Sequence, residues 1–597
     1  MGLIVQKYGG TSVGSVERIQ AVAARVARTA QAGHSVVVVV SAMGKTTDSL
    51  VDLAKAITPN PNKREMDMLM STGEQVSIAL LSIALQEIGQ PAISLTGAQV
   101  GIITEAEHTK ARIIEIPCDR IHRHLDAGQV VVVAGFQGIS SSDDLEITTL
   151  GRGGSDTSAV ALAAALKADC CEIYTDVPGI LTADPRLVPN AQLMAEITAD
   201  EMLELASLGA KVLHPRAVET ARNYGVELVV RSSWGEQPGT RVVSPPRQAI
   251  APAGLELTQP VDAVEFDLDQ AKIALLRVPD RPGIAAQLFT SVADQSIDVD
   301  LIIQSIHEGN TNDIAFTVGR NVKNRTEAVA MAVAPKLRGD RGQDAAEVLV
   351  DPEIAKVSIV GAGMIGRPGI AARMFQALAG AGINIQMIST SEVKVSCVIE
   401  GIDCDRAIQT LCATFGVASS SLATIPSPKE ARPVRGVALD QDQAQLAIRN
   451  VADRPGMAAQ IFGALAAQNI SVDMIIQSQR CRLVDGSPTR DIAFTLHRSE
   501  SGLAKQILEQ AITDRGEVVV DQAIAKVSIV GAAMINHPGT AAAMFSALAQ
   551  AQINIKMITT SEIKVSCVVA QDQAVKALQV IHQAFGLGGD TIIEMPA

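Results

Sequence analysis

A duplication within the chain constrains its fold more than any other feature of the sequence. Asp280-Arg-Pro-Gly283 recurs as Asp453-Arg-Pro-Gly456, and the segment from Lys394 to Val398 recurs from Lys564 to Val568. The second copies lie about 170 residues after the first, so one block of that length occurs twice. Equivalent sequences bury equivalent faces, and the C-terminal part of the chain must therefore be built from similar units.

Each block of about 170 residues contains two similar units. Arg281-Pro-Gly283 matches Arg367-Pro-Gly369, and Arg454-Pro-Gly456 matches His537-Pro-Gly539. A unit of about 85 residues results, in which a strand precedes a Pro-Gly turn that opens a helix, and strand, strand, helix and strand follow. Pro- and Gly-rich stretches at 237–260 and 426–436 are typical of linkers. We expect four α+β units of βαββαβ type in two tandem pairs, over residues 261–345, 346–425, 434–518 and 519–597.

Residues 1–245 carry no such repeat. Short β-branched runs, such as Val36 to Val40 and Val130 to Val133, alternate with Ala-rich amphipathic segments. That alternation predicts an α/β domain, an αβα sandwich around a mostly parallel sheet. Hydrophobic residues make up 47% of the chain, enough for sizeable cores, whereas aromatic residues make up 2%, too few for a platform that stacks bases.

The charge balance bears on possible partners. The net charge of −14 argues against nucleic acid and against an anionic membrane, but not against a local phosphate site. Eight cysteines without CxxC spacing favour buried thiols over disulfides or zinc. No apolar run reaches the roughly 18 residues that span a bilayer, and Met1 leads directly into a strand-like segment. We expect a cytoplasmic protein without a protein-held metal.

Three glycine- or hydroxyl-rich turns follow predicted strands in the first domain. The turn from Lys7 to Ser12 lets the backbone approach phosphate oxygens, with Lys7 as a mobile positive charge, although it is not a Walker A sequence. The turn from Ser41 to Thr47 suits a small polar substrate at the carboxyl end of a sheet. Glu74, in the turn from Ser71 to Gln75, can pair with an ammonium group or can simply be a charge at a helix start.

The segment from Leu150 to Asp156 is the most informative. Its arginine stands among three glycines, an arrangement that is entropically costly unless it binds a ligand. Arg152 can hold a carboxylate with two hydrogen bonds, and Asp156 can organise an amine or a metal. Further turns, from Tyr174 to Arg186 and from Gly209 to Arg216, suit a nucleotide, so several ligand-binding turns occur on one domain.

These segments together resemble the aspartate kinases of the amino-acid kinase family. The resemblance rests on KYGGTSVG, SAMGKTTD, STGEQ, GRGGSD, YTDVPGILTADPR and GAKVLHPRAVE in this order, and it covers the whole chain because the repeats resemble the ACT regulatory domains of those enzymes. Acetylglutamate, glutamate 5- and uridylate kinases share the fold but not this set of motifs. Most aspartate kinases carry one pair of ACT units, so the two pairs here depart from the family pattern.

The resemblance implies roles for individual residues. Lys7, Glu74, Arg152 and Asp156 would be catalytic, with Lys7 at the transferring phosphoryl group and Asp156 near the reacting groups. Aspartate would be held by Ser41, Thr47, Glu74, Arg152, Gly153 and Ser155. ATP, with Mg²⁺ held mainly by the nucleotide, would lie among Lys7, Tyr8, Gly9, Gly10, Thr175, Asp176, Leu181, Thr182, Asp184, Arg186 and Lys211.

The implied reaction agrees with the residues present. The product would be 4-phospho-L-aspartate, formed in the first step towards lysine, threonine and methionine. A carboxylate nucleophile is already ionised at pH 7, so the reaction needs positioning and charge neutralisation rather than a general base. The lack of a Ser-His-Asp or Cys-His arrangement is then expected.

The repeated half is interpreted as a sensor. In the Asp-Arg-Pro-Gly turns of units one and three, free N–H groups face an incoming carboxylate and the aspartate can take an ammonium group, which suits a free amino acid. Lysine or threonine, or both, would be the feedback inhibitors. The expected effector residues are Asp280, Pro282, Gly283, Ile284, Gln304, Asn384, Ile385, Ser391, Glu392, Asp453, Pro455, Gly456, Gln477, Asn554, Ile555, Ser561 and Glu562.

Other interpretations remain open at this level. The GxGxxG match from Gly361 to Gly366 would suit a dinucleotide, but its repeat from Gly531 to Asn536 lacks two of the three glycines, so a fused homoserine dehydrogenase is not expected. Two alternatives are a kinase of the same fold that acts on glutamate and a non-catalytic amino-acid sensor. We expect a homodimer formed through the edge strands of the ACT sheets.

Overall fold

The computed structural model describes most of the chain. The residues described are 2–142, 144–208, 212–245, 254–256, 259–306, 311–338, 347–364, 367–421, 432–484, 486–512, 516–534 and 537–589.

The N-terminal domain is built on an eight-stranded, mostly parallel sheet. Its strand order is β10-β12-β11-β9-β1-β2-β6-β3, with β11 and β12 antiparallel, and a small second sheet has the order β5-β4-β7-β8. The strands are β1 (Leu3–Tyr8), β2 (Ser35–Val40), β3 (Ala92–Leu95), β4 (Ile103–Thr104), β5 (Ile113–Glu115), β6 (Val130–Ala134), β7 (Gln137–Ser140), β8 (Ile147–Thr149), β9 (Cys170–Thr175), β10 (Glu196–Thr198), β11 (Leu228–Ser232) and β12 (Thr240–Val243). The helices are α1 (Val16–Gln31), α2 (Thr46–Ile57), α3 (Lys63–Met70), α4 (Thr72–Glu87), α5 (Gly97–Val100), α6 (Asp119–Asp126), α7 (Gly154–Ala165), α8 (Ala199–Ser207) and α9 (Pro215–Tyr224).

The valine-rich central strands explain why this sheet is covered on both faces. Side chains alternate across a strand, so Val36 and Val38 pack in the core formed with α1 and α4, whereas Val37 and Val39 pack in the core formed with α7. A parallel strand buried on both faces reads as a continuous apolar run. The predicted αβα sandwich is therefore confirmed, and the carboxyl ends of β1, β2, β6 and β9 lie at one edge of the sheet.

The helices α3 and α4 form a long apolar stretch from Lys63 to Glu87. This stretch is long and apolar enough to cross a bilayer, although the apolar runs of the sequence do not suggest it. Half of its most apolar window is buried inside the protein. Buried residues of α4, such as Ile78, Leu81 and Leu85, pack on the central sheet, as expected for a core helix.

The C-terminal half consists of ACT-type antiparallel units, as predicted. One sheet has eleven strands, ordered β17-β18-β16-β13-β15-β14-β27-β28-β26-β20 with β19 beside β13, and another has the order β22-β24-β21-β25 with β23 beside β24. The strands are β13 (Ala263–Pro279), β14 (Ile302–Ile306), β15 (Thr311–Gly319), β16 (Glu347–Val360), β17 (Met387–Thr390), β18 (Lys394–Glu400), β19 (Ser419–Ser421), β20 (Gly436–Asp440), β21 (Gln443–Ala452), β22 (Val472–Gln477), β23 (Arg482–Val484), β24 (Ser487–His497), β25 (Glu517–Asp521), β26 (Ile524–Val530), β27 (Met557–Thr560) and β28 (Lys564–Ala570). The helices are α10 (Ile284–Ala293), α11 (Lys323–Arg338), α12 (Ile370–Gly380), α13 (Cys404–Phe415), α14 (Met457–Ala466), α15 (Ser501–Ala511), α16 (Thr540–Gln550) and α17 (Ala574–Ala584).

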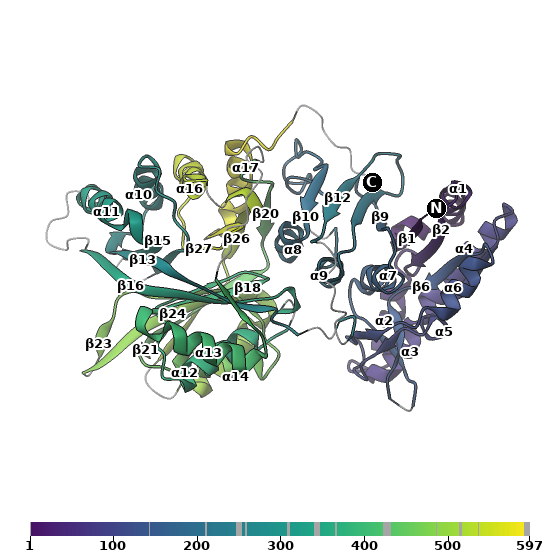
Figure 1. Ribbon diagram of the computed structural model, residues 1–597, viewed down its shortest axis with the longest axis horizontal. Coiled ribbons are helices and arrows are strands. Elements are labelled where there is room, and N and C mark those ends of the chain that lie inside the picture. The colour runs from purple at the N-terminus through teal and green to yellow at the C-terminus, as the bar shows by residue number, and fades with distance from the viewer. Residues whose placement is uncertain are drawn as a thin grey trace.

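The units pair across the duplication rather than in tandem. Unit one pairs with unit four, because β14 joins β27 in one sheet and α10 packs on α16. Unit two packs on unit three through α12 and α14 and through β17 and β22. Figure 1 shows the two pairs as layers, with α10, α11, α16 and α17 on one side of the strands and α12, α13 and α14 on the other. The two pairs that are tandem in the sequence thus form two spatial pairs, each of which takes one unit from either block.

The strands also cross the expected unit boundaries. The first part of β13, from Ala263 to Asp267, pairs with the later part of β16, in unit two. Likewise β20, at the start of the expected third unit, pairs with β26 in the fourth. A leading strand can complete the sheet of the following unit because antiparallel pairing depends on a free strand edge and not on chain order.

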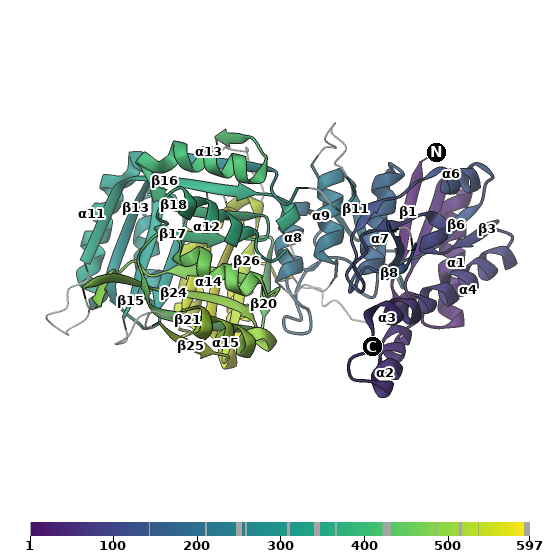
Figure 2. The ribbon, with the colours of Figure 1, turned by 90° about the horizontal axis from the view of Figure 1, so that it is seen from below.

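The two halves contact each other through specific polar groups. Glu204 of α8 forms a buried ion pair with Lys564 of β28, with 2.8 Å between Oε2 and Nζ. The hydroxyl of Thr182 lies 2.9 Å from Nε2 of His582 on α17. Figure 2 shows α8 and β20 side by side at this junction. The C-terminal half is therefore in direct contact with the N-terminal domain.

Candidate active site

The candidate site begins with an ion pair between β1 and α7. Nζ of Lys7 lies 2.6 Å from Oδ1 of Asp156, and their side chains are only 12% and 11% exposed. Lys7 stands near the carboxyl end of β1, and Asp156 lies in the first turn of α7. The helix N-terminus favours negative charge, so it attracts an anion bound beside Asp156.

Two glycine contacts hold the turns after β1 and β2 together. A Cβ at Gly10 would lie 2.7 Å from the carbonyl oxygen of Ala42, so no larger residue fits there. The N–H of Gly44 donates to the carbonyl of Gly10 at 3.0 Å, and the N–H of Ser41 donates to the carbonyl of Tyr8 at 3.1 Å. Ser41, Thr47, Gly9 and Gly10 are thereby brought to one edge of the sheet, as the sequence predicts.

Glu74 lies beside this edge with unusual electrostatics. Its Oε1 accepts the N–H of Ala42 at 3.1 Å, while no residue in the described part of the chain donates to its buried Oε2. Burial raises the pKa of Glu74 to about 7, and the hydrogen bonds from backbone N–H groups oppose that shift. A carboxylate in this state gains charge stabilisation from a cation such as a substrate ammonium group.

The glycines around Arg152 are explained by backbone conformation. Gly151 and Gly153 have φ angles of +79° and +68°, which side chains rarely adopt. A Cβ at Gly153 would lie 2.2 Å from the ring of His214. Arg152 is exposed between them, and Ser155 is buried in the first turn of α7. The loop therefore presents a single long cation near Lys7 and Asp156.

Four of the expected nucleotide residues form two pairs, Thr175 with Asp176 and Asp184 with Arg186. Thr175 and Asp176 lie at the end of β9, beside β1, with 3.1 Å between the hydroxyl of Thr175 and Oδ1 of Asp176. Asp184 pairs with Arg186 through three side-chain hydrogen bonds, of which Nη2 to Oδ2 is 2.7 Å, and this bonding lowers the pKa of Asp184. Lys211 lies outside the described residues.

Three residues expected at the nucleotide have side chains that pack against protein. The side chain of Tyr8 is fully buried and stacks on Tyr174 with 4.7 Å between ring centroids, so only its backbone can face a ligand. Thr182 is buried, and its carbonyl accepts from the N–H of Val437 in the C-terminal half. Leu181 packs against the core of the same half. These side chains face protein because the turn from Tyr174 to Arg186 has one side against the repeats.

The expected effector residues gather at four places between paired units. Loop 280–284 and Gln304 of unit one meet Asn554 and Ile555 of unit four. Likewise, Asp453, Pro455, Gly456 and Gln477 of unit three meet Asn384 and Ile385 of unit two. Both of these sites are nearly closed, because hydrogen bonds cross them. Nδ2 of Asn554 donates to Asp280 at 2.8 Å, and Nε of Arg490 donates to Asp453 at 2.7 Å.

Two wider cavities hold the remaining expected residues. Ser561 and Glu562 line one of about 310 Å³ between units one and four, and Ser391 and Glu392 line one of about 140 Å³ between units two and three. Burial raises the pKa of Glu392 to about 7.

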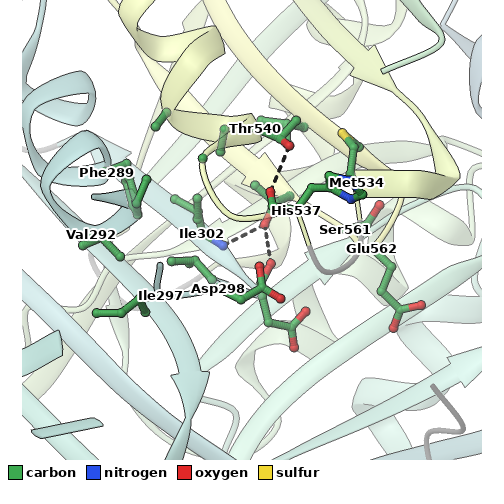
Figure 3. Close-up of a pocket in the computed structure, with 18 of the residues that line it drawn as sticks. Phe289, Val292, Ile297, Asp298, Ile302, Met534, His537, Thr540, Ser561 and Glu562 are labelled. Carbon is green, nitrogen blue, oxygen red and sulfur yellow. Dashed lines mark hydrogen bonds between the residues drawn. The ribbon is translucent and has the colours of Figure 1, made fainter. Parts of the chain in front are cut away.

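The larger cavity is acidic on one side and apolar on the other. Figure 3 shows Phe289, Val292 and Ile297 along one wall, with Asp298 and Glu562 reaching towards the space and His537 and Thr540 contributed by unit four. Asp300 also lines it and pairs with Lys356. Burial, followed by the neighbouring Asp300, raises the pKa of Asp298. Glu562 pairs with Lys394, so among these three carboxylates it is Asp298 that forms no ion pair in the described part of the chain and can favour a cationic group.

Sequence reasoning missed a support beneath the Arg152 loop. Arg216 of α9 donates through Nη1 to the carbonyl of Leu150 at 2.6 Å and forms an ion pair of 3.0 Å with Glu256. The segment that contains Glu256 reads as a Pro-rich linker, and nothing in its composition indicates that this carboxylate returns to the N-terminal domain. The proline-led helix start at His214-Pro215-Arg216 is the only signal in the sequence.

Comparisons with known proteins agree with this arrangement. A model of the amino acid kinase family matches residues 2–232, and a model of the ACT domain matches residues 357–415, 446–512 and 527–585. The chain is 50% identical over 416 residues to an aspartate kinase of Stutzerimonas stutzeri, covering 70% of this chain and 97% of that protein. It is 51% identical over 425 residues to an aspartokinase of Geobacillus stearothermophilus, covering 71% and 99%.

A solved structure is similar over the full length. The aspartate kinase from Synechocystis is 66% identical to this chain, with 100% of both chains covered and a TM-score of 0.88. The Stutzerimonas and Geobacillus proteins match about 70% of this chain and have no counterpart for the rest of it, whereas the Synechocystis protein matches the whole chain.

Proposed function

The chain belongs to the aspartate kinases of the amino acid kinase family, and on that premise we propose the roles of its residues. The enzyme transfers the γ-phosphoryl group of ATP to the side-chain carboxylate of L-aspartate and forms 4-phospho-L-aspartate and ADP. The observation that carries this proposal is the placement of Lys7, Asp156, Glu74 and the Arg152 loop at one edge of the sheet. Arg152 binds a carboxylate of aspartate, and Glu74 accepts its ammonium group.

Charge neutralisation is the main contribution of these residues. The attacking carboxylate is already ionised, so catalysis consists of bringing two anions together and stabilising the charge that develops. Lys7 turns from Asp156 towards the transferring phosphoryl group, and the turn at Gly9 and Gly10 lies beneath the phosphates. Gly153 and Ser155 contribute backbone and hydroxyl contacts to aspartate, together with Ser41 and Thr47.

The nucleotide is proposed to bring its own metal ion. Mg²⁺ would be held mainly by the phosphates of ATP and would supply positive charge that offsets theirs. Thr175, Asp176, Asp184, Arg186 and Lys211 are proposed around the nucleotide.

Release of ADP from MgATP tests the substrate assignment. We expect turnover that depends on L-aspartate and not on L-glutamate. Turnover with glutamate alone would replace the proposal with a kinase for the longer acid. No turnover with either acid, in folded protein that binds lysine or threonine, would favour a non-catalytic sensor.

The regulatory half is proposed to bind lysine, threonine or both as feedback inhibitors. The larger cavity, where Asp298 lies beside the Asp300–Lys356 and Glu562–Lys394 ion pairs, suits the side-chain ammonium of lysine, while the nearly closed sites at Asp280 and Asp453 suit a smaller amino acid. Calorimetric titration tests this. Replacing Glu562 with Gln should weaken lysine binding and leave threonine binding intact, whereas equal losses for both would refute the division between sites.

A cytoplasmic homodimer completes the proposal. The edges of β14 and β27, which would have joined two chains, pair with each other inside one chain. A dimer through the ACT units must therefore use other strand edges, such as β25 at the end of its sheet. Sedimentation equilibrium would show one species of twice the chain mass; a monomer at micromolar concentration would exclude this assembly.

A further inference from the structure

The guanidinium of Arg216 supports the loop that carries Arg152. Its Nη1 donates to the carbonyl of Leu150 at 2.6 Å, and its Nη2 donates to the carbonyl of Ala111 at 2.9 Å. The N–H of Leu150 donates to the carbonyl of Phe136 at 2.9 Å, so both peptide groups of this residue are held. Leu150 is fully buried and stands two residues before Arg152. It is thus the last firmly held point before the exposed loop.

The loop itself has little else to fix its conformation. Two of the residues around Arg152, Gly151 and Gly153, are in the left-handed region and carry no side chain to pack. Glycine is the residue with the most conformational freedom, so a loop of this kind depends on anchors at its ends. The far anchor is the contact of Gly153 with His214, which lies two residues before Arg216. Both anchors therefore involve the start of α9.

Arg216 is held in turn by a residue outside the N-terminal domain. Glu256 accepts from Nε of Arg216 through Oε1 and from Nη2 through Oε2, each at 3.0 Å. Its Oε2 also accepts the N–H of Ile113 at 2.7 Å, and the residue is only 6% exposed. A buried, two-point guanidinium–carboxylate pair fixes both orientation and distance. The segment that links the two halves therefore takes part in supporting the site.

The regulatory half contacts the same glutamate. Nη2 of Arg367, in the Arg-Pro-Gly turn of unit two, donates to the backbone carbonyl of Glu256 at 2.8 Å. Arg367 also lines the cavity of about 140 Å³ that contains Ser391 and Glu392. A continuous chain of polar contacts thus runs from this cavity through Glu256 and Arg216 to Leu150.

We propose that Arg216 and Glu256 are positioning residues for Arg152, and that the contact of Arg367 with Glu256 transmits occupation of the unit two–unit three cavity to the aspartate site. The proposal rests on the proposed role of Arg152 in binding aspartate. Because the path ends at the aspartate side of the site, it affects aspartate more than ATP.

Steady-state kinetics of Arg216→Lys test the positioning role. Lysine keeps the charge but cannot bond Leu150, Ala111 and Glu256 at once, so we expect KM for aspartate to rise about tenfold with KM for ATP within about twofold of the wild type. The matched control is Arg222→Lys on the same helix, where the arginine pairs with Asp200 at 2.5 Å. If Arg216→Lys raises KM for both substrates, the role of Arg216 is merely structural and the proposal is overturned. The proposal is also overturned if kcat and the unfolding temperature fall by as much as they do in Arg222→Lys.

A parallel variant separates this inference from the proposed function. Arg152→Lys should itself raise KM for aspartate. If it does and Arg216→Lys does not, the positioning role is wrong while the aspartate role of Arg152 stands. If Arg152→Lys leaves aspartate kinetics unchanged, the premise fails and the positioning role fails with it.

Glu256→Gln tests the transmission. Its side chain does not line the cavity, so lysine and threonine should bind to the variant with wild-type affinity in calorimetry. The rise in KM for aspartate that lysine and threonine cause should be less than half of the rise in the wild type. Unchanged inhibition with unchanged binding would refute transmission through this residue. Loss of effector binding would also refute it, because Glu256 would then act on the cavity and not between the sites.

Discussion

Lys7 and Asp156 form an ion pair of 2.6 Å that joins β1 to the first turn of α7. The two residues stand far apart in the chain, and each belongs to a turn that the sequence analysis identified separately. Within the pair each charge neutralises the other, so an incoming phosphate must attract Lys7 away from Asp156. The site is thus prepared for an anion without leaving an isolated charge.

Replacing Lys7 with Ala should lower kcat by about 100- to 1,000-fold, the usual loss when one group that stabilises transition-state charge is removed. The fold should be retained, since the side chain lies at the edge of the sheet. Lys45→Ala, on the exposed part of the turn after β2, is the control and should keep near-normal turnover. Turnover close to the wild type in Lys7→Ala would remove Lys7 from the mechanism.

The acid limb of the activity profile should report Glu74. Burial raises the pKa of this carboxyl group to about 7, so below that pH it is protonated and cannot pair with the ammonium group of aspartate. We expect kcat/KM for aspartate to fall about tenfold per pH unit below 7. Glu74→Gln should have a low and flat profile in the same range. A Gln variant with the wild-type acid limb would assign that limb to another group.

Gly153→Ala should disable aspartate binding. The added Cβ would lie 2.2 Å from the His214 ring, at a φ angle of +68°. We expect a loss of kcat/KM for aspartate of about tenfold or more, with partial recovery when His214 is also replaced by Ala. The control is Gly89→Ala, where φ is +79° but no atom lies within 4 Å. Equal effects of the two substitutions would show that strain alone, and not the contact with His214, is responsible.

Glu219 should make the protein less stable in alkaline solution. Burial raises its pKa from 4.5 to about 8, opposed by Arg367 and Arg112. The folded state therefore keeps a proton that the unfolded state loses, so the free energy of unfolding falls as the pH rises from about 5 through 8. Between pH 6 and 9 the unfolding temperature of the wild type should fall by at least about 2 °C more than that of Glu219→Gln. Parallel plots of unfolding temperature against pH for the wild type and Glu219→Gln would show that Glu219 is ionised in the folded protein. The control is Glu87→Gln, at an exposed position.

Much of the architecture could be predicted from the sequence because it depends on local patterns. The valines of β2 and β6 indicate strands buried on both faces, and the repeated Pro-Gly turns locate α10, α12, α14 and α16. The pairing of unit one with unit four could not be predicted in this way. All four units carry similar edges, and which edges meet is decided by contacts far apart in the chain.

The candidate site was predictable where a turn has an unusual composition. Gly151 and Gly153 indicated a constrained loop at Arg152, and both have positive φ. That the side chains of Tyr8 and Thr182 face protein could not be predicted, because a motif does not reveal which side of a turn packs on the rest of the chain. The role of Glu256 could not be predicted either, because it depends on where the linker passes: Gly254 and Leu255 also contact the N-terminal domain, and their composition does not indicate it.

Trapping the product with hydroxylamine is the most direct test of the central claim. Hydroxylamine attacks an acyl phosphate at carbon and releases phosphate, leaving a stable hydroxamate. We expect MgATP and L-aspartate to give aspartyl hydroxamate substituted on the side-chain carboxyl, in amounts equal to the ADP formed, and at least about 100-fold less with Lys7→Ala. ADP without hydroxamate, or hydroxamate from L-glutamate instead, would contradict the account.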